Sequence, residues 1–118
     1  MREDIGRYLE GRLHDTQQLI KIVYDIATGQ GRDVNAWVEG RELVFGRKEP
    51  GKGTGFLRLL PSEVSLTISF PRGHELPDPL KRARGVRGSR TKLTIRTTSD
   101  LDSYVRRMID AAYALDTG

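Results

Sequence analysis

The sequence predicts a single α+β domain, residues 1–118, in which an antiparallel sheet of about five strands is covered on one face by N- and C-terminal helices. Three observations support this fold class. Apolar residues recur at helical spacing near both ends of the chain. Between these ends, apolar residues follow the shorter period of strands, and short turns join the segments. The length of 118 residues accommodates one hydrophobic core and is too short for two.

Two helices are expected in the first part of the chain. Residues 1–13 carry apolar side chains four apart on one helical face, namely Ile5, Leu9 and Leu13. Asp15 or Thr16 is expected to cap a second helix that runs to about Ala27. The apolar stripe of this second helix comprises Leu19, Ile20, Val23, Ile26 and Ala27.

Four strands are expected between residues 33 and 70. The last of them is the clearest, because Val64, Leu66, Ile68 and Phe70 alternate with small polar residues, which indicates one buried and one wet face. Short connections between consecutive strands imply antiparallel pairing. The predicted ranges are Asp33–Val38, Arg41–Lys48, Thr54–Leu60 and Glu63–Phe70.

The last third of the chain is expected to add one strand and the final helix. A proline just before it favours a single helical turn over Leu80–Arg84. A fifth strand is predicted over Thr91–Thr97. Ser99, followed three residues later by Asp102, resembles a capping box and is predicted to open the C-terminal helix.

Composition excludes several classes of protein. The chain has no cysteine, which excludes disulfides, thiolate catalysis and thiolate metal sites. No apolar run approaches the length of about 20 residues that a membrane-spanning helix needs, so no membrane contact is expected. The N-terminus carries both signs of charge and no apolar stretch typical of a signal peptide, which predicts a cytoplasmic protein.

Positive charge is concentrated in one segment. Residues 72–92 contain seven basic and two acidic residues, whereas the rest of the chain is nearly neutral. A solvated loop is the simplest explanation of such a run. The functional explanation is a site for an anionic ligand, an acidic partner surface or nucleic acid. The candidate contacting residues are Arg72, His74, Lys81, Arg82, Arg84, Arg87, Arg90 and Lys92.

Other chemistries find less support in the residues. His14 and His74 lie in different predicted elements and outside any nucleophile motif, so no catalytic residue is assigned. The loop Gly46–Thr54 has the composition of a phosphate-binding loop, but a strand and not a helix is expected after it, so no cofactor is predicted. The acidic residues near the N-terminus need not share a helical face, so their spacing assigns no metal ligand.

A mixed pocket wall is a further hypothesis. Trp37 is the only tryptophan and lies in the first predicted strand. Alternation in the third predicted strand places Phe56, Arg58 and Leu60 on one face. Together with Tyr104 of the C-terminal helix, Trp37 and Arg58 predict a small-molecule pocket between sheet and helices. An open sheet face or edge would also allow a homodimer.

The stretch Phe70–Pro79, with its Leu-Pro-Asp-Pro turn followed by a basic loop, is similar to the YdhG-like domain family of small bacterial proteins. The similarity covers roughly residues 41–115, and the turn is its most specific part. The matching positions are Phe70, Gly73, Leu76, Pro77, Asp78, Pro79, Gly85, Gly88, Lys92, Leu93, Ile95, Ser99, Leu101 and Ile109. The resemblance implies an α+β fold built on an antiparallel sheet. It also implies, for some members, a frataxin-like handling of iron, which would involve carboxylates near the first helix, in this chain Glu3, Asp4, Glu10 and Asp15.

These patterns together predict a small non-catalytic binding or accessory protein. Its segment 72–92 is expected to contact an anionic ligand or partner, because the net positive charge of the chain is gathered there. Iron binding, implied by the resemblance, and small-molecule binding beside Trp37 are the alternatives.

Overall fold

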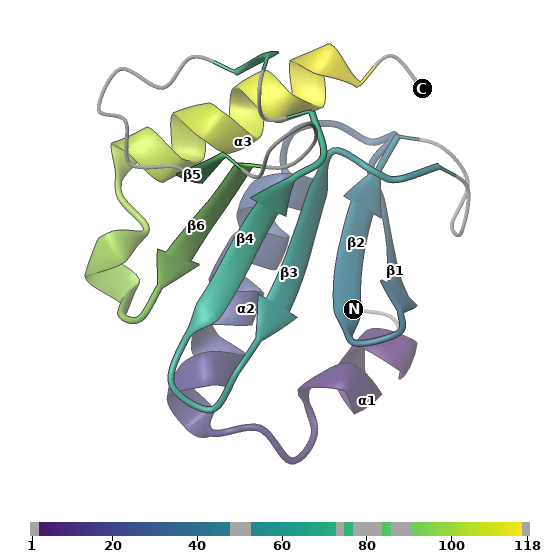
Figure 1. Ribbon diagram of the computed structural model, residues 1–118. Coiled ribbons are helices and arrows are strands. Elements are labelled where there is room, and N and C mark those ends of the chain that lie inside the picture. Colours follow the sequence, from purple (N-terminus) through teal and green to yellow (C-terminus); the bar gives the residue numbers. More distant parts are fainter. Residues whose placement is uncertain (1–2, 48–52, 73–74, 77–83, 86–90, 117–118) are drawn as a thin grey trace.

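The computed structural model describes residues 3–47, 53–72, 75–76, 84–85 and 91–116. Helices lie at both ends of the chain and strands between them, so the chain has the predicted α+β fold (Figure 1). The helices are α1 (Glu3–Leu9), α2 (His14–Thr28) and α3 (Ser103–Leu115), and a short 3-10 helix, η2 (Thr98–Asp100), precedes α3. Within these residues, no helix combines the length and the apolar character needed to cross a bilayer.

The sheet is antiparallel, with the strand order β1-β2-β3-β4-β6-β5. The first four strands are neighbours in sequence as well as in space, because their short connections allow only antiparallel pairing. After β4 the chain passes β6 and forms the two-residue strand β5 at the edge before it returns as β6. The strands are β1 (Asn35–Glu39), β2 (Glu42–Gly46), β3 (Leu57–Pro61), β4 (Leu66–Phe70), β5 (Arg84–Gly85) and β6 (Thr91–Ile95).

One face of the sheet is covered by helices. In Figure 1, α2 crosses behind the strands, and buried residues of α3 belong to the same core. α1 packs beside β1 and adds Ile5 and Leu9 to this core. Each fully buried large side chain stabilises the fold by about 1.5–3 kcal/mol relative to exposure. The strands contribute Leu43, Phe45, Leu57, Leu59, Leu66, Ile68 and Phe70 to the core, all fully buried.

The first predicted helix is wrong at its C-terminal end. α1 stops at Leu9, and Gly11 adopts a φ of 78°, a left-handed conformation that ends the helical path. Leu13, predicted on the apolar face of that helix, is consequently 61% exposed in the connection to α2. Leu13 is also the N-cap residue of α2, so neither Asp15 nor Thr16 has that role.

The predicted strands are confirmed in order, but the first four begin one to three residues later than expected, and the shift is largest at β3 and β4. β4 begins at Leu66 because Ser62 and Ser65 close a turn in front of it. The backbone N–H of Ser62 donates to the Ser65 carbonyl at 2.8 Å, and the Ser65 N–H donates to Ser62 Oγ at 3.1 Å. Val64 lies inside this turn and is exposed. The predicted fourth strand therefore loses its first residues to the turn.

β3 begins only at Leu57, so the residues before it do not follow the alternation of the strand. Phe56, predicted on the same face as Arg58, instead belongs to the core on the helical side. Its ring packs edge-on against Tyr113 of α3, with 5.7 Å between ring centroids.

The C-terminal capping box forms two residues earlier than predicted. It consists of Thr97 and Asp100 around η2. Ser99 therefore lies within η2 and does not open α3. Asp102, predicted as the partner of Ser99, is itself the N-cap of α3 and accepts a hydrogen bond from the Val105 N–H at 3.2 Å.

Candidate functional site

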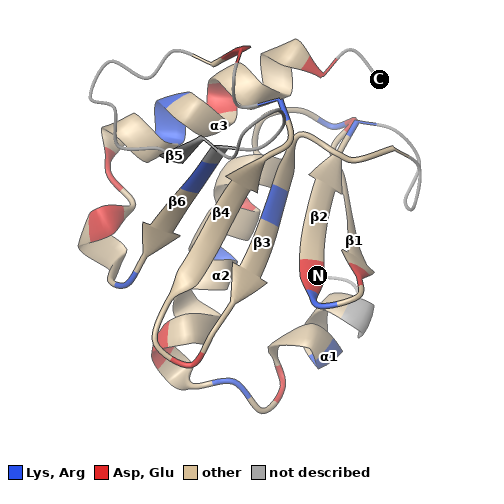
Figure 2. Ribbon diagram, viewed as in Figure 1, with Lys and Arg blue, Asp and Glu red and all other residues tan. Residues whose placement is uncertain are grey.

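The two faces of the sheet differ in chemistry. Apolar side chains point to the helices, whereas the opposite face, which we term the open face, carries the alternate residues of each strand. The open face is turned toward the viewer in Figure 2. The strand register aligns one row across it, formed by Trp37, Val44, Arg58, Ser69 and Lys92. The row runs from an aromatic residue at the β1 edge to an exposed lysine beside β5.

Arg58 is a buried cation in the middle of this row. Its side chain is only 5% exposed, and it contacts Glu39 Oε2 from Nη2 and Glu42 Oε1 from Nε, both at 3.2 Å. Nη1 donates to the Thr54 carbonyl at 2.9 Å, and Trp37 Nε1 donates to Glu39 at 3.3 Å. Because two carboxylates neutralise this guanidinium, it is committed to holding β1, β2 and β3 together.

Four polar side chains form a contiguous group on the open face of β4 and β6. Thr67 and Thr94 are direct Cα partners, as are Ser69 and Lys92. We term these four residues the donor patch. They supply three hydroxyl groups and one ammonium group, and none of them hydrogen-bonds or ion-pairs through its side chain with another described residue. In Figure 2, β4 and β6 carry one basic band and no acidic one.

Exposure within the donor patch is graded. Lys92 and Thr94 are exposed and Thr67 is half-buried, whereas Ser69 is only 3% exposed. Residues directly opposite each other on antiparallel strands have Cβ atoms about 5 Å apart. Several members of the patch can therefore contact one anionic group at the same time.

Part of the predicted basic segment lies among the described residues. The Arg72 guanidinium is occupied, since it donates to Glu75 from Nε at 2.5 Å and from Nη2 at 2.9 Å, and to the Leu115 carbonyl at 2.7 Å. The hydrogen bonds to Glu75 raise the pKa of Arg72 above its ordinary value. Arg84 lies in β5 as the Cα partner of Lys92, so the predicted helical turn Leu80–Arg84 is wrong at its last residue.

Residues 80–83 of the predicted turn lie outside the described residues. The same holds for five candidate contacting residues: His74, Lys81, Arg82, Arg87 and Arg90.

The predicted pocket residues are divided between the two faces of the sheet. Trp37 and Arg58 both lie on the open face, separated by Val44, and both are buried. Tyr104 of α3 belongs to the core on the helical side. The structure thus brings two of the three residues together, and the three do not line one pocket.

The described residues contain no place where three His, Asp or Glu side chains gather as metal ligands would. Glu10 and Asp15 are exposed and flank the connection from α1 to α2, and Glu3 and Asp4 begin α1. His14 is the exposed first residue of α2.

A further arginine is fixed at the C-terminal end of α3. Arg47 donates from Nε to Asp33 at 2.7 Å and from Nη1 to the Asp116 carbonyl at 2.8 Å, and it stacks on Tyr113 at 4.3 Å from the ring centroid. The Tyr113 hydroxyl donates to Asp33 at 2.6 Å. This hydrogen bond, followed by that from Arg47, lowers the pKa of Asp33. Arg47, the cation near the start of the loop Gly46–Thr54, therefore makes its contacts with other residues of the fold.

Comparisons with known proteins add no functional information to this geometry. No family model, curated protein or solved structure matches the chain. The similarity to the YdhG-like family stays a prediction.

Sequence reasoning missed the hydroxyl groups of the donor patch, although the signal was present. Alternation along the fourth predicted strand assigns Thr67 and Ser69 to its wet face, and Lys92 belongs to the basic segment. The missing information was the pairing of β4 with β6, which are separated by residues 71–90. Turn lengths predict pairing only between strands that follow each other closely.

Proposed function

We propose that the chain is a non-catalytic binding protein, and that its donor patch contacts an anionic ligand or partner through phosphate or carboxylate oxygens. The observation that carries the proposal is the exposed Lys92 ammonium on the same sheet face as the Thr67 and Thr94 hydroxyl groups, on two strands that contain no acidic residue. Ammonium and hydroxyl groups all donate hydrogen bonds, and charge-assisted donors to anionic oxygens are the stronger kind.

The other cations near the sheet support this assignment by contrast. Arg47, Arg58 and Arg72 each contact carboxylates of the chain itself, so their charge stabilises the fold. Lys92 has no such contact with another described residue. Arg84, its neighbour in register, places a second basic residue at the same edge of the sheet.

Retention on a heparin column, a sulfated polyanion, tests the proposal. Lys92→Glu is expected to elute at clearly lower salt than the wild type, because an ammonium that attracts the sulfate groups is replaced by a carboxylate that repels them. Lys21→Glu is the matched control, since Lys21 is an exposed lysine of α2, on the opposite side of the sheet. Equal shifts for the two variants would show that only net charge matters and would contradict a site at the donor patch.

The hydroxyl groups are tested without any change of charge. Thr67→Val and Thr94→Val keep the shape of the side chain and remove a donor from the patch. The double variant is expected to elute at lower salt than the wild type while its net charge is unchanged. Unchanged retention would restrict the contact to Lys92 and remove the hydroxyl groups from the proposal.

A further inference from the structure

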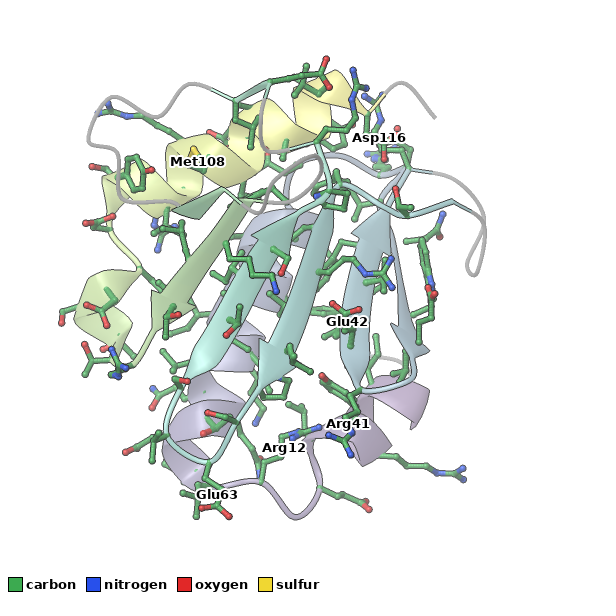
Figure 3. The ribbon with its side chains drawn as sticks, in the orientation of Figure 1. Arg12, Arg41, Glu42, Glu63, Met108 and Asp116 are labelled. Carbon is green, nitrogen blue, oxygen red and sulfur yellow. The ribbon has the colours of Figure 1, made fainter. Side chains whose placement is uncertain are left out.

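A hollow of about 660 Å³, lined by none of the donor-patch residues, lies at the lower end of the molecule in Figure 3. It is bounded by the α1–α2 connection, the β1–β2 turn and the β3–β4 turn. Its size falls within the range of small-molecule sites, about 300–1,000 Å³. Figure 3 labels its three charged residues, Arg12, Arg41 and Glu63. The other lining residues are Gly11, Leu13, Pro61 and Ser62.

Tyr8 positions the side chain of Arg12 and the backbone of Arg41 beside the hollow. Arg12 Nε donates to the Tyr8 carbonyl at 2.8 Å, and the Arg12 guanidinium lies over the Tyr8 ring, 4.5 Å from its centroid. The Tyr8 hydroxyl donates to the Arg41 carbonyl at 2.6 Å and so fixes the β1–β2 turn. The left-handed φ of Gly11 then directs the chain so that Arg12 faces that turn. The hydrogen bond from Tyr8 to Arg41 thus joins residues that are 33 positions apart in sequence.

The cationic groups of the hollow retain binding capacity. Arg41 is exposed, and its guanidinium makes no hydrogen bond or ion pair with another described residue. Arg12 uses Nε for Tyr8, and its terminal nitrogens have no hydrogen-bond partner among the described residues. Glu63, on the facing turn, likewise has none. Two guanidinium groups and one carboxylate leave the hollow with a single excess positive charge.

We infer that this hollow binds a small amphipathic monocarboxylate. The carboxylate group lies between the guanidinium groups of Arg12 and Arg41, whose planar forks match its geometry. The apolar part of the ligand covers Leu13 and Pro61, which line the hollow beside the arginines. Glu63 disfavours ligands with a second negative charge, so a carboxylate is preferred to a phosphate dianion. This site is separate from the donor patch.

The test is a titration followed by protein NMR with three probes: 4-methylpentanoate, its neutral amide and inorganic phosphate. We expect 4-methylpentanoate to shift the backbone resonances of Arg12, Leu13 and Arg41, with an affinity at least about tenfold higher than that of the amide or of phosphate. Arg41→Gln is expected to weaken carboxylate binding about tenfold, and Glu63→Gln is expected to strengthen phosphate binding.

Two matched variants separate this site from other effects. Arg107→Gln removes an exposed arginine of α3 and is expected to leave carboxylate binding unchanged. Lys92→Glu is also expected to leave it unchanged, so loss of the donor patch and loss of the hollow are distinguishable. Equal affinity for the carboxylate and its amide, tighter binding of phosphate, or binding that is indifferent to Arg41→Gln would each overturn the inference.

Discussion

Gly11 and Gly55 adopt nearly the same left-handed φ, 78° and 73°, but their surroundings differ. A Cβ atom on Gly11 would meet nothing within 4 Å. On Gly55 it would lie 2.5 Å from the Phe45 carbonyl oxygen and 2.7 Å from Val44 Cγ1. We expect Gly11→Ala to lower the free energy of unfolding by about 1 kcal/mol, from the dihedral angle alone. Gly55→Ala is expected to cost about 3 kcal/mol or more, because the clash adds to that strain.

Urea denaturation of the two variants measures this difference. Because the dihedral angles match, Gly11→Ala is the control that isolates backbone conformation from steric conflict. Equal losses of stability would show that the approach of Gly55 to β2 has no energetic consequence. The contact matters because Thr54, the neighbour of Gly55, supplies the carbonyl that binds buried Arg58.

At the scale of elements, Arg58 joins β1, β2 and β3 through two carboxylates of unequal exposure. The Glu42 side chain is 22% exposed and that of Glu39 is 54% exposed. Removal of either carboxylate leaves the same buried guanidinium, so the difference in stability rests on the carboxylate: water screens the attraction less where the carboxylate is less exposed. We expect Glu42→Gln to lower the free energy of unfolding by about 1–2 kcal/mol and Glu39→Gln by less than about 0.5 kcal/mol, measured in urea. A larger loss for Glu39→Gln would contradict this ranking.

Helices and strands were predictable where apolar residues recur regularly over many positions. The residues at which these elements begin and end were not predictable. α3 has a continuous apolar stripe, which is a strong helix signal. In front of it, Thr97 with Asp100 and Ser99 with Asp102 offer two equivalent capping patterns, and sequence alone does not choose between them. At the other end of the chain, a single positive φ at Gly11 overrides the four-residue spacing that continues to Leu13.

At the scale of the whole molecule, the candidate sites depend on which cations find carboxylates. Counting charges along the sequence treats all 20 Lys and Arg residues alike. The fold separates them, because Arg47 reaches Asp33 and Arg58 reaches Glu39 and Glu42 across strands. The sequence therefore predicted the layered architecture, and its basic segment already contained Lys92, one member of the donor patch. It did not identify Arg41, since an isolated arginine in a hairpin turn carries no signal before the hollow around it is known.

The pH dependence of stability is a property of the whole fold to which Asp33 contributes on the acid side. Its pKa lies below the ordinary value of 3.8, because Tyr113 and then Arg47 hydrogen-bond to the carboxylate. The native state therefore favours the ionised form, and this stabilisation is complete above about pH 3.8 and is lost as the pH falls through the lowered pKa. Urea denaturation at a series of pH values is expected to show the difference between wild type and Asp33→Asn shrinking below that pH. A difference that stays constant would contradict the assignment.

On the alkaline side, Tyr8 contributes to the pH dependence of stability. Burial raises its pKa to about 12, Arg12 opposes the shift and Glu42 adds to it. Because the folded protein favours the neutral phenol, this contribution is complete below about pH 10 and is lost as the pH rises toward 12. The difference in unfolding free energy between wild type and Tyr8→Phe is expected to be constant from pH 4 to 9 and to shrink above about pH 10. Since the Tyr8 hydroxyl also fixes the Arg41 backbone beside the hollow, the same variant is expected to weaken 4-methylpentanoate binding at neutral pH, while the acid-side dependence that Asp33 contributes stays in place. If the free energy of unfolding of Tyr8→Phe falls above pH 10 as steeply as that of the wild type, another group is responsible for the loss.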